Sequence, residues 1–253
     1  MSVTRAMLLA AGRGERLRPL TDRVPKPLIP LGGQPMVFRV LTRLAAAGIR
    51  QVHINTHHLG AQLPEAIGDG SRWGVRVVWH HEAEILGTGG GLANALNESP
   101  ELADAPVLMI NSDILVDADL NALIATHAAH PSGEPLATLV LRPDPAAEHY
   151  GVIATDDAGR IRRFLTTDTG GATREYMFTG IQIIAPRLLK PLAERRGPFA
   201  ITEPYMQALA AGETLMGHIH TGYWSDLGTP ERLMQAEADL TAGKLDAPPF
   251  PAA

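Results

Sequence analysis

The sequence contains no cysteine, which excludes disulfides, thiolate catalysis and cysteine-ligated zinc together. It also lacks any apolar run near the roughly 20 residues that span a bilayer. Residues 1–11 read as a short strand that runs into a glycine loop, so no signal peptide is expected there. The net charge is −5, which provides no basic footprint for nucleic acid. These absences predict a cytoplasmic protein without nucleic-acid or membrane partners.

The composition that remains is that of an ordinary globule. Over 253 residues, 45% are hydrophobic and 19% are charged, which suffices for the core of one α/β domain. Residues 1–245 are predicted to form a single domain, and residues 246–253 are predicted to form a frayed tail.

The first 31 residues combine a strand, a glycine loop and a cluster of cations. The apolar run from Ala6 to Ala11 predicts a buried strand, which ends in a loop with Gly12 and Gly14. Glycine lets backbone amides close around phosphate oxygens. The cations of this segment are Arg13, Arg16, Arg18, Arg23 and Lys26. We therefore predict a polyphosphate site; the alternative is a structural turn with solvated arginines.

Two familiar glycine motifs are absent from this loop. The dinucleotide fingerprint requires a third glycine where this chain has Leu17, followed directly by a helix. A P-loop would end in Gly-Lys-Ser/Thr, which does not occur. Four prolines between residues 19 and 30 instead favour an irregular segment.

The pattern downstream alternates between strands and helices. Helical spacing occurs at 35–48, 61–67, 91–96, 120–130, 186–195 and 203–211, and a last helix follows the N-cap Thr229. Strands are predicted at 51–56, 75–79, 106–110 and 136–141, and short ones at 151–155, 160–164 and 176–184. This order predicts a doubly wound, mainly parallel sheet with a β-rich extension.

Two aspartates stand where strands or turns end. Asp113 follows a buried strand, and ligands of open α/β sheets bind beyond the carboxyl ends of strands. A carboxylate there suits Mg²⁺, although Asp113 or Asp117 could equally start the next helix. Asp226 lies in the segment 223–230, where an ordinary turn residue is the alternative.

These motifs together identify a resemblance. The pattern L-A-A-G-x-G-x-R-L-x-P-L-T over residues 9–21, followed by P-K-P-L over 25–28, resembles the signature of the sugar-1-phosphate nucleotidyltransferases. The family implies a Rossmann-like nucleotidyltransferase fold with a small β-rich sugar-binding extension. It implies transfer of a nucleoside monophosphate from a nucleoside triphosphate to a sugar 1-phosphate, with release of pyrophosphate. Residues 1–135 would then bind mainly nucleotide, and residues 136–228 mainly sugar phosphate.

The resemblance assigns roles residue by residue. The catalytic residues implied are Arg16, Lys26, Asp113 and Asp226, with Mg²⁺ held by Asp113 and Asp226. The nucleotide-binding residues implied are Ala11, Gly12, Gly14, Glu15, Arg16, Lys26, Glu82, Gly87 and Thr88. The sugar-side residues implied are Asn111, Gly151, Glu175, Thr179 and Gly180. The glycine run 86–91 would be a base-recognition loop, and a flexible loop before a helix is the alternative.

Two departures from the usual family pattern bear on the substrate. Glu15 stands where many members carry threonine, and residues 165–167 read Leu-Thr-Thr where hexose-1-phosphate members carry Glu-Lys-Pro. The compact length, residues 87–91, the turn at 68–74 and residues 231–233 look most like the uridylyltransferases that act on N-acetylmuramate α-1-phosphate in cell-wall recycling. The three consecutive glycines with Glu82 resemble uridylyl- and thymidylyltransferases, so UTP is favoured. The alternatives are guanylyl transfer to mannose 1-phosphate, thymidylyl or uridylyl transfer to glucose 1-phosphate, and a regulatory protein that binds sugar nucleotides without catalysis. The oligomeric state stays open.

The ten histidines complete no ligand set. His57–His58 and His80–His81 are adjacent pairs whose side chains would point to opposite faces of a strand. His218 and His220 could share a face, but no third ligand stands at a zinc spacing. We therefore predict structural roles for them.

Overall fold

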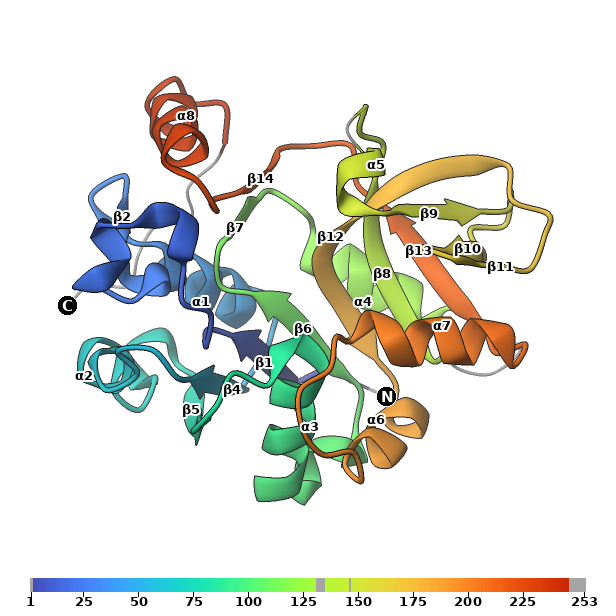
Figure 1. Cartoon of the computed structure of the whole chain (residues 1–253), viewed down its shortest axis with the longest axis horizontal. Helices are drawn as coiled ribbons and strands as arrows, with labels where there is room; N and C mark the ends of the chain where they lie inside the picture. Colours follow the sequence, from blue (N-terminus) through green and yellow to red (C-terminus); the bar gives the residue numbers. More distant parts are fainter. Residues whose placement is uncertain (1, 131–134, 146, 246–253) are drawn as a thin grey trace. The chain divides into compact units, whose positions relative to one another are not determined.

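The computed structural model describes residues 2–130, 135–145 and 147–245. The chain divides into two compact units, which are interleaved in sequence (Figure 1). Unit 2 comprises Thr4–Ile85, Ile110–Leu120 and residues 222–245, and unit 1 comprises Leu86–Met109 and Asn121–Thr221 with residues 2–3. The strand β6 (Val107–Asn111) crosses from one unit to the other at Met109.

Unit 2 contains a parallel sheet of buried strands. β1 (Arg5–Leu9) pairs with β4 (Gln51–Thr56), and β4 pairs with β5 (Arg76–His81), both in parallel. Helices α1 (Met36–Ala46) and α2 (Gln62–Ile67) connect them. The segment after β1 forms three short 3₁₀ turns instead of a helix, as its prolines predict. The predicted α/β class with a mainly parallel central sheet is confirmed.

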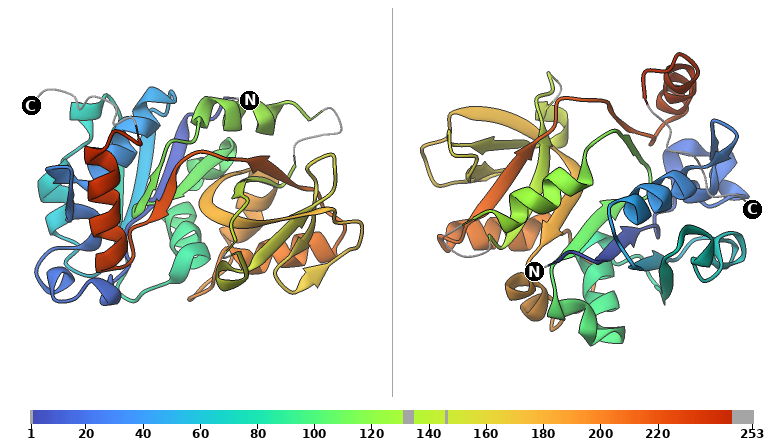
Figure 2. Two further views of the ribbon diagram at one scale, coloured as in Figure 1. Left: turned by 90° about the horizontal axis from the view of Figure 1, so that it is seen from above. Right: turned by 180° about the vertical axis from the view of Figure 1, so that it is seen from behind.

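A second core of unit 2 joins three segments that lie far apart in sequence. The hairpin of β2 (Pro30–Leu31) and β3 (Gln34–Pro35) and the antiparallel pair β7 (Ile114–Val116) and β14 (Trp224–Asp226) pack with α8 (Pro230–Thr241). Figure 2 shows α8 (red) beside the blue N-terminal segments. The buried side chains of this core are Leu17, Ile29, Leu31, Met36, Leu115, Leu227, Ala236 and Leu245. This core fixes the glycine loop against the two aspartate-bearing segments.

Unit 1 is rich in antiparallel strands, as predicted for the second half of the chain. Its long strand β12 (Arg174–Ile184) pairs with β8 (Ala137–Arg142) on one side and β9 (Val152–Thr155) on the other. The other strands are β10 (Ile161–Phe164), β11 (Thr167–Asp168) and β13 (Leu215–Ile219), the last parallel to β8. Its helices are α3 (Gly87–Glu98), α4 (Leu120–Ala128), α5 (Ala147–Tyr150), α6 (Pro186–Leu192) and α7 (Thr202–Ala210).

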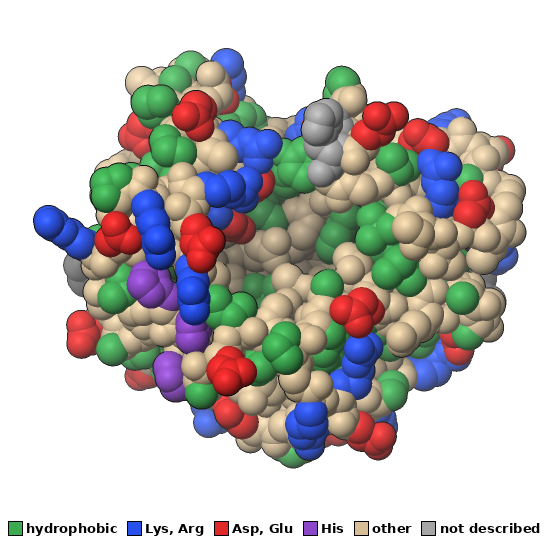
Figure 3. All heavy atoms as spheres, viewed as in Figure 1, with side chains coloured by type: hydrophobic (Ala, Val, Ile, Leu, Met, Phe, Trp, Pro, Cys, Tyr) green, Lys and Arg blue, Asp and Glu red, His purple; other side chains and the backbone are tan. Residues whose placement is uncertain are grey.

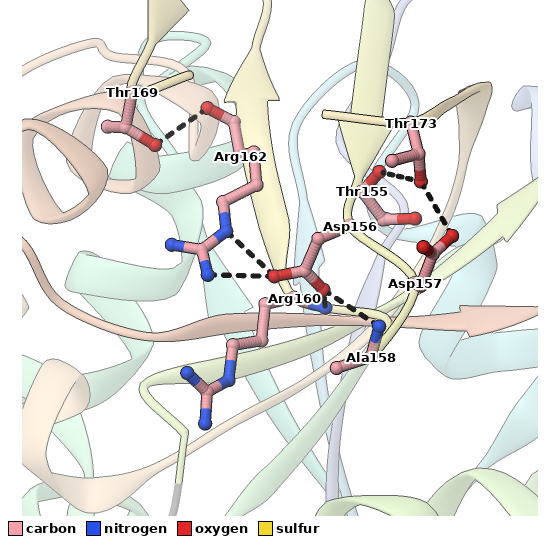
Figure 4. A network of polar contacts seen from close by, with 8 residues as sticks. All are labelled: Thr155, Asp156, Asp157, Ala158, Arg160, Arg162, Thr169 and Thr173. Atoms are coloured by element: carbon pink, nitrogen blue, oxygen red, sulfur yellow. Dashed lines mark hydrogen bonds and ion pairs between the residues drawn. The ribbon is translucent and has the colours of Figure 1, made fainter. Parts of the chain in front are cut away.

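The hairpin of β9 and β10 is fixed by one carboxylate (Figure 4). Asp156 Oδ1 accepts the backbone N–H groups of Ala158 and Arg160 at 3.0 Å. Its Oδ2 accepts Arg162 Nε at 2.8 Å. Burial would raise the pKa of Asp156, but these hydrogen bonds outweigh it and lower the pKa. The carboxylate therefore stays ionised and ties the turn to β10.

Two further predictions concern membrane-spanning segments and the C-terminal tail. None of the helices in the described ranges is long and apolar enough to cross a membrane. The predicted tail, residues 246–253, lies outside the described residues. The division into nucleotide-binding and sugar-binding halves stays a prediction.

Candidate functional site

The glycine loop has open space beside Gly12 and a tightly packed turn at Gly14. The backbone N–H of Ala10, just after β1, donates to Asn55 Oδ1 at 2.8 Å. A Cβ on Gly12 would have no heavy atom within 4 Å, so the space beside this glycine is open. Gly14 has φ +64°, and a Cβ there would lie 2.7 Å from a methyl carbon of Thr21. Thr21 Oγ1 donates to the Gly14 carbonyl at 2.9 Å, which fixes the turn.

Lys26 stands in the third 3₁₀ turn and is buried, with 10% of its side chain exposed. The prolines on either side fix its backbone, because each has a restricted φ. Its Nζ forms an ion pair with Asp113 Oδ2, which joins the N-terminal segment to the loop after β6. The structure thus brings together two of the four residues predicted to be catalytic.

Asp226 lies next to this pair in the same unit. β14 pairs with β7 so that Asp226 stands opposite Ile114, and the Leu227 N–H donates to the Asp113 carbonyl at 2.9 Å. The two aspartates are therefore neighbours across an antiparallel ribbon, although they are 113 positions apart in the sequence. The resemblance implied that the two aspartates meet, but the strand pairing that brings them together was not predicted, because β7 and β14 have only three residues each.

Two arginines contact the Asp226 carboxylate. Arg232 Nη1 donates to Asp226 Oδ2 at 2.8 Å, and Arg16 Nη2 lies 3.9 Å from the same oxygen. The other oxygen, Oδ1, is buried without a hydrogen-bond partner among the described residues. A Cβ on Gly228 would collide with the Arg16 guanidinium and lie 2.7 Å from Asp226 Oδ1, so a larger residue there would require these side chains to shift.

Arg232 was missed by the sequence prediction. It lies in the first turn of α8, where Thr229 caps the helix by accepting the Arg232 N–H at 3.4 Å. The cap was predicted, and the side chain of a residue at this helix position points back toward the helix N-terminus. An arginine six residues after the predicted metal ligand was thus the available signal.

Glu82 is held by a series of hydrogen bonds between buried and partly buried polar groups. Asn55 Nδ2 donates to Glu82 Oε1 at 2.6 Å, while Asn55 Oδ1 accepts the Ala10 amide. His57 Nδ1 lies 2.8 Å from the Glu82 carbonyl oxygen. Asn55 therefore links the ends of three parallel strands, and it too was missed. Its signal was the same as that of Asp113: a polar residue near the end of an apolar strand.

The carboxylates of Asp113 and Asp226 fit a hard divalent cation. Mg²⁺ takes one or two carboxylates together with substrate phosphates and water. The unpartnered Asp226 Oδ1 is a buried acceptor that a cation would satisfy. The described ranges contain no group of three or more His, Cys, Asp or Glu side chains that could hold a metal. A site here would thus depend on two protein ligands plus substrate oxygens.

The glycine run near residue 90 differs from its predicted form. The helix α3 begins at Gly87 itself, so the run is not a loop before a helix at 91. The Gly89 and Gly90 N–H groups donate to the Phe199 carbonyl at 3.0 and 3.2 Å. Thr88 Oγ1 accepts the Ile201 N–H at 2.9 Å. The close backbone approach that glycine permits is made here by the segment around Phe199, and the nucleotide contacts of Gly87 and Thr88 stay a prediction.

The predicted sugar-side residues of unit 1 have partners within that unit. Thr179 is buried and donates from Oγ1 to the Val140 carbonyl at 2.8 Å. Glu175 forms an exposed ion pair with Arg163. Gly151 and Gly180 have φ of +90° and +83°, which glycine alone adopts readily.

The remaining predicted residues lie in unit 2. Asn111 ends β6, Ala11 is buried just before the glycine loop, and Glu15 is exposed, 3.9 Å from Arg13. Figure 3 shows Lys and Arg side chains (blue) gathered below α8, over the part of this face where Figure 1 places β2 and the N-terminal segments beside it.

The histidines described in the core have protein partners. His53 Nδ1 lies 2.8 Å from His80 Nε2, and the two rings stack. His127 Nδ1 lies 2.8 Å from Thr138 Oγ1, and His218 Nδ1 lies 2.9 Å from Thr126 Oγ1. Burial lowers the pKa of His53 to about 3 and that of His127 to about 4. Neutral buried rings of this kind support the predicted structural roles.

Comparison with known proteins agrees with the resemblance. The family model described as nucleotidyl transferase matches residues 5–243. The N-acetylmuramate alpha-1-phosphate uridylyltransferase of Neisseria meningitidis is 36% identical over 95% of this chain and 100% of its own length. The mannose-1-phosphate guanylyltransferase of Mycobacterium tuberculosis is 33% identical over 96% of this chain, which spans 66% of that relative.

A solved structure shares the fold. A Bacillus anthracis protein described as a glucose-1-phosphate thymidylyltransferase, in complex with sucrose, has a TM-score of 0.76 and 22% identity. The match covers 94% of each chain, so it extends through both units. The family model and the full-length relative show that the chain belongs to the nucleotidyl transferase family.

Proposed function

We propose that this family member transfers a uridylyl group from UTP to N-acetylmuramate α-1-phosphate, giving UDP-N-acetylmuramate and pyrophosphate with the help of Mg²⁺. The relative from Neisseria meningitidis, matched over its whole length, supports this choice of substrates. The observation that supports the chemistry best is a cluster in unit 2, where Lys26 and Arg16 from two 3₁₀ turns contact Asp113 and Asp226 at the ribbon of β7 and β14.

The reaction is an in-line displacement at phosphorus. An oxygen of the sugar 1-phosphate attacks the α-phosphorus, a new P–O bond forms, and the bond from the α-phosphorus to the bridging oxygen breaks. Pyrophosphate takes the electron pair. Such a transfer depends on positioning and charge neutralisation, and it needs no protein nucleophile.

The residues of the cluster have separate tasks in this scheme. Lys26, fixed between two prolines, holds the reacting phosphates. Arg16, whose side chain is 64% exposed, neutralises the departing pyrophosphate. Asp113 and Asp226 would hold Mg²⁺, which when bound supplies positive charge to the phosphate oxygens. The open space beside Gly12 admits a phosphate oxygen to the loop amides.

One alternative function is supported by a relative, and a second is disfavoured by the site. The Mycobacterium tuberculosis relative favours guanylyl transfer to mannose 1-phosphate, although the chain spans only 66% of its length. A regulatory protein that binds sugar nucleotides without catalysis is the other. It would have no need for a buried lysine paired with a strand-end aspartate, so the cluster favours an enzyme.

A matrix of substrates tests the proposal. Pyrophosphate release is measured with UTP, GTP and dTTP against the 1-phosphates of N-acetylmuramate, mannose and glucose. The proposal expects the highest kcat/KM for UTP with N-acetylmuramate α-1-phosphate, and no release with EDTA present. A higher kcat/KM for GTP with mannose 1-phosphate would favour the guanylyltransferase. Binding of a nucleotide sugar without release from any pair would favour the regulatory protein.

A further inference from the structure

The proposed reaction assigns no role to Arg232, a third cation that contacts the cluster of Lys26, Arg16, Asp113 and Asp226. Arg232 Nη1 donates to Asp226 Oδ2 at 2.8 Å, and 38% of its side chain is exposed. Its backbone is fixed by the helix cap at Thr229. A long side chain on a fixed backbone can move its guanidinium by rotamer change without disturbing the helix.

The charges of the cluster are unbalanced. Three cations, Lys26, Arg16 and Arg232, face the two carboxylates of Asp113 and Asp226, so one positive charge is left over. A divalent metal ion approaching these carboxylates meets a net positive cluster and competes with the arginines for the same oxygen. A polyphosphate meets the opposite situation, because every one of its oxygens attracts guanidinium groups.

We propose that Arg232 is a polyphosphate-binding residue that exchanges the Asp226 carboxylate for phosphate oxygens, and so couples metal binding at Asp226 to polyphosphate binding. The inference rests on the proposed function. It goes beyond that function by making Arg232 a ligand of the polyphosphate and by linking its movement to metal binding at Asp226. When the guanidinium leaves Oδ2, both oxygens of Asp226 become available, since Oδ1 already has no hydrogen-bond partner among the described residues.

The exchange predicts effects of opposite sign in one variant. Replacing Arg232 with glutamine removes the competing charge, so the protein alone should bind a divalent cation more tightly. The same change removes a phosphate ligand, so pyrophosphate binding should weaken. An arginine that merely supports the fold would not separate the two, because loss of structure weakens both.

The experiment uses the full-length protein and two probes. Binding of Mn²⁺ alone is measured by electron paramagnetic resonance, and binding of pyrophosphate with EDTA present is measured by isothermal titration calorimetry. Arg232→Gln should lower the Kd for Mn²⁺ by about threefold or more and raise the Kd for pyrophosphate by about tenfold. Arg232→Lys, which keeps the charge, should lie between this variant and wild type in both measurements.

A matched control is available in unit 1. Arg162 forms an ion pair of the same 2.8 Å length with Asp156, and it belongs to no part of the proposed site (Figure 4). Arg162→Gln should leave both dissociation constants unchanged. Weaker binding of both probes by Arg232→Gln, or no change in either, would overturn the exchange while leaving the proposed function intact. A wild-type protein that binds neither Mn²⁺ nor pyrophosphate would overturn both proposals.

Discussion

The two units use their polar residues in different ways. In unit 2, charged side chains from distant segments meet at the ends of strands, as Lys26, Asp113 and Asp226 do. In unit 1, the predicted nucleotide-binding and sugar-side residues are mostly glycines and threonines, and the threonines form hydrogen bonds within the fold, as Thr88 and Thr179 do. Bringing charged side chains together in a partly buried cluster has a desolvation cost, so such a cluster indicates a function rather than a contribution to stability. A glycine or a hydrogen-bonded threonine is explained by packing alone. The comparison therefore expects activity defects from changes in unit 2 and stability defects from changes in unit 1.

The largest effect is expected from Lys26→Met, which removes the buried cation of unit 2. Turnover should fall by about 10²–10³-fold, the scale for loss of one preorganised electrostatic contact. Methionine keeps the length of the stem, so the surrounding packing stays close to that of the wild type. The measurement is kcat for pyrophosphate release, with Lys190→Met on α6 of unit 1 as the exposed control.

Stability must be separated from activity in this variant, because Lys26→Met leaves the Asp113 carboxylate without its partner. The double variant Lys26→Met/Asp113→Asn removes the unpaired charge and should restore the urea midpoint without restoring turnover. Recovery of turnover together with stability would show that Lys26 acts through the fold, and the proposed contrast between the units would be wrong.

The next effect concerns the two aspartates of unit 2. Asp113→Asn and Asp226→Asn should each lower turnover by about 10²-fold and weaken the dependence on Mg²⁺. Residues that act as one unit are not additive, so the double variant should be little worse than the worse single one. Losses that multiply would contradict a shared metal and would leave Asp113 alone with that role. Their adjacency across β7 and β14 makes a shared ion geometrically reasonable.

The sequence predicted these residues better than it predicted their arrangement. The strand at 51–56 was predicted at its observed bounds and the helix after Thr229 at its observed start, because periodicity and caps are local signals. The ribbon of β7 and β14 was not predicted, since three-residue strands have no period and their pairing is non-local. Asn55 was missed for the same reason, because its partners Ala10 and Glu82 follow other strands. Arg232 was missed although its partner Asp226 lies only six residues before it in the sequence.

The glycines allow the comparison to be tested with the smallest possible change. Gly89→Ala in unit 1 places a Cβ against the ring of Phe199 and 3.1 Å from the Ala200 carbonyl carbon. Overpacking of this kind should cost about 1–3 kcal/mol of unfolding free energy. Gly12→Ala in unit 2 adds a Cβ with no heavy atom within 4 Å, so stability should change by less than about 0.5 kcal/mol.

The two glycine variants should rank in the opposite order when their effect on the KM for the nucleotide is compared. Gly12→Ala fills the space beside the loop amides, so the KM for the nucleotide should rise, whereas Gly89→Ala should leave it unchanged. Urea denaturation and initial-rate kinetics on the same preparations measure both quantities. A raised nucleotide KM in a stable Gly89→Ala protein would instead support the base-recognition role predicted for this run.

The smallest effect concerns a property in which the units should be alike. His53 in unit 2 and His127 in unit 1 are both buried, and burial lowers their pKa to about 3 and about 4. The unfolded chain therefore binds a proton at these rings from about pH 6.5 downward while the folded chain does not. The free energy of unfolding should therefore decrease as the pH is lowered, by about 1 kcal/mol per histidine between pH 7 and pH 5.5. His53→Asn and His127→Asn, whose amides stay neutral, should each reduce the pH dependence of the urea midpoint by a similar amount, whatever their effect at pH 7. An unchanged slope in one variant only would show that its ring already takes up a proton in the folded state, and acid sensitivity would then distinguish the two units.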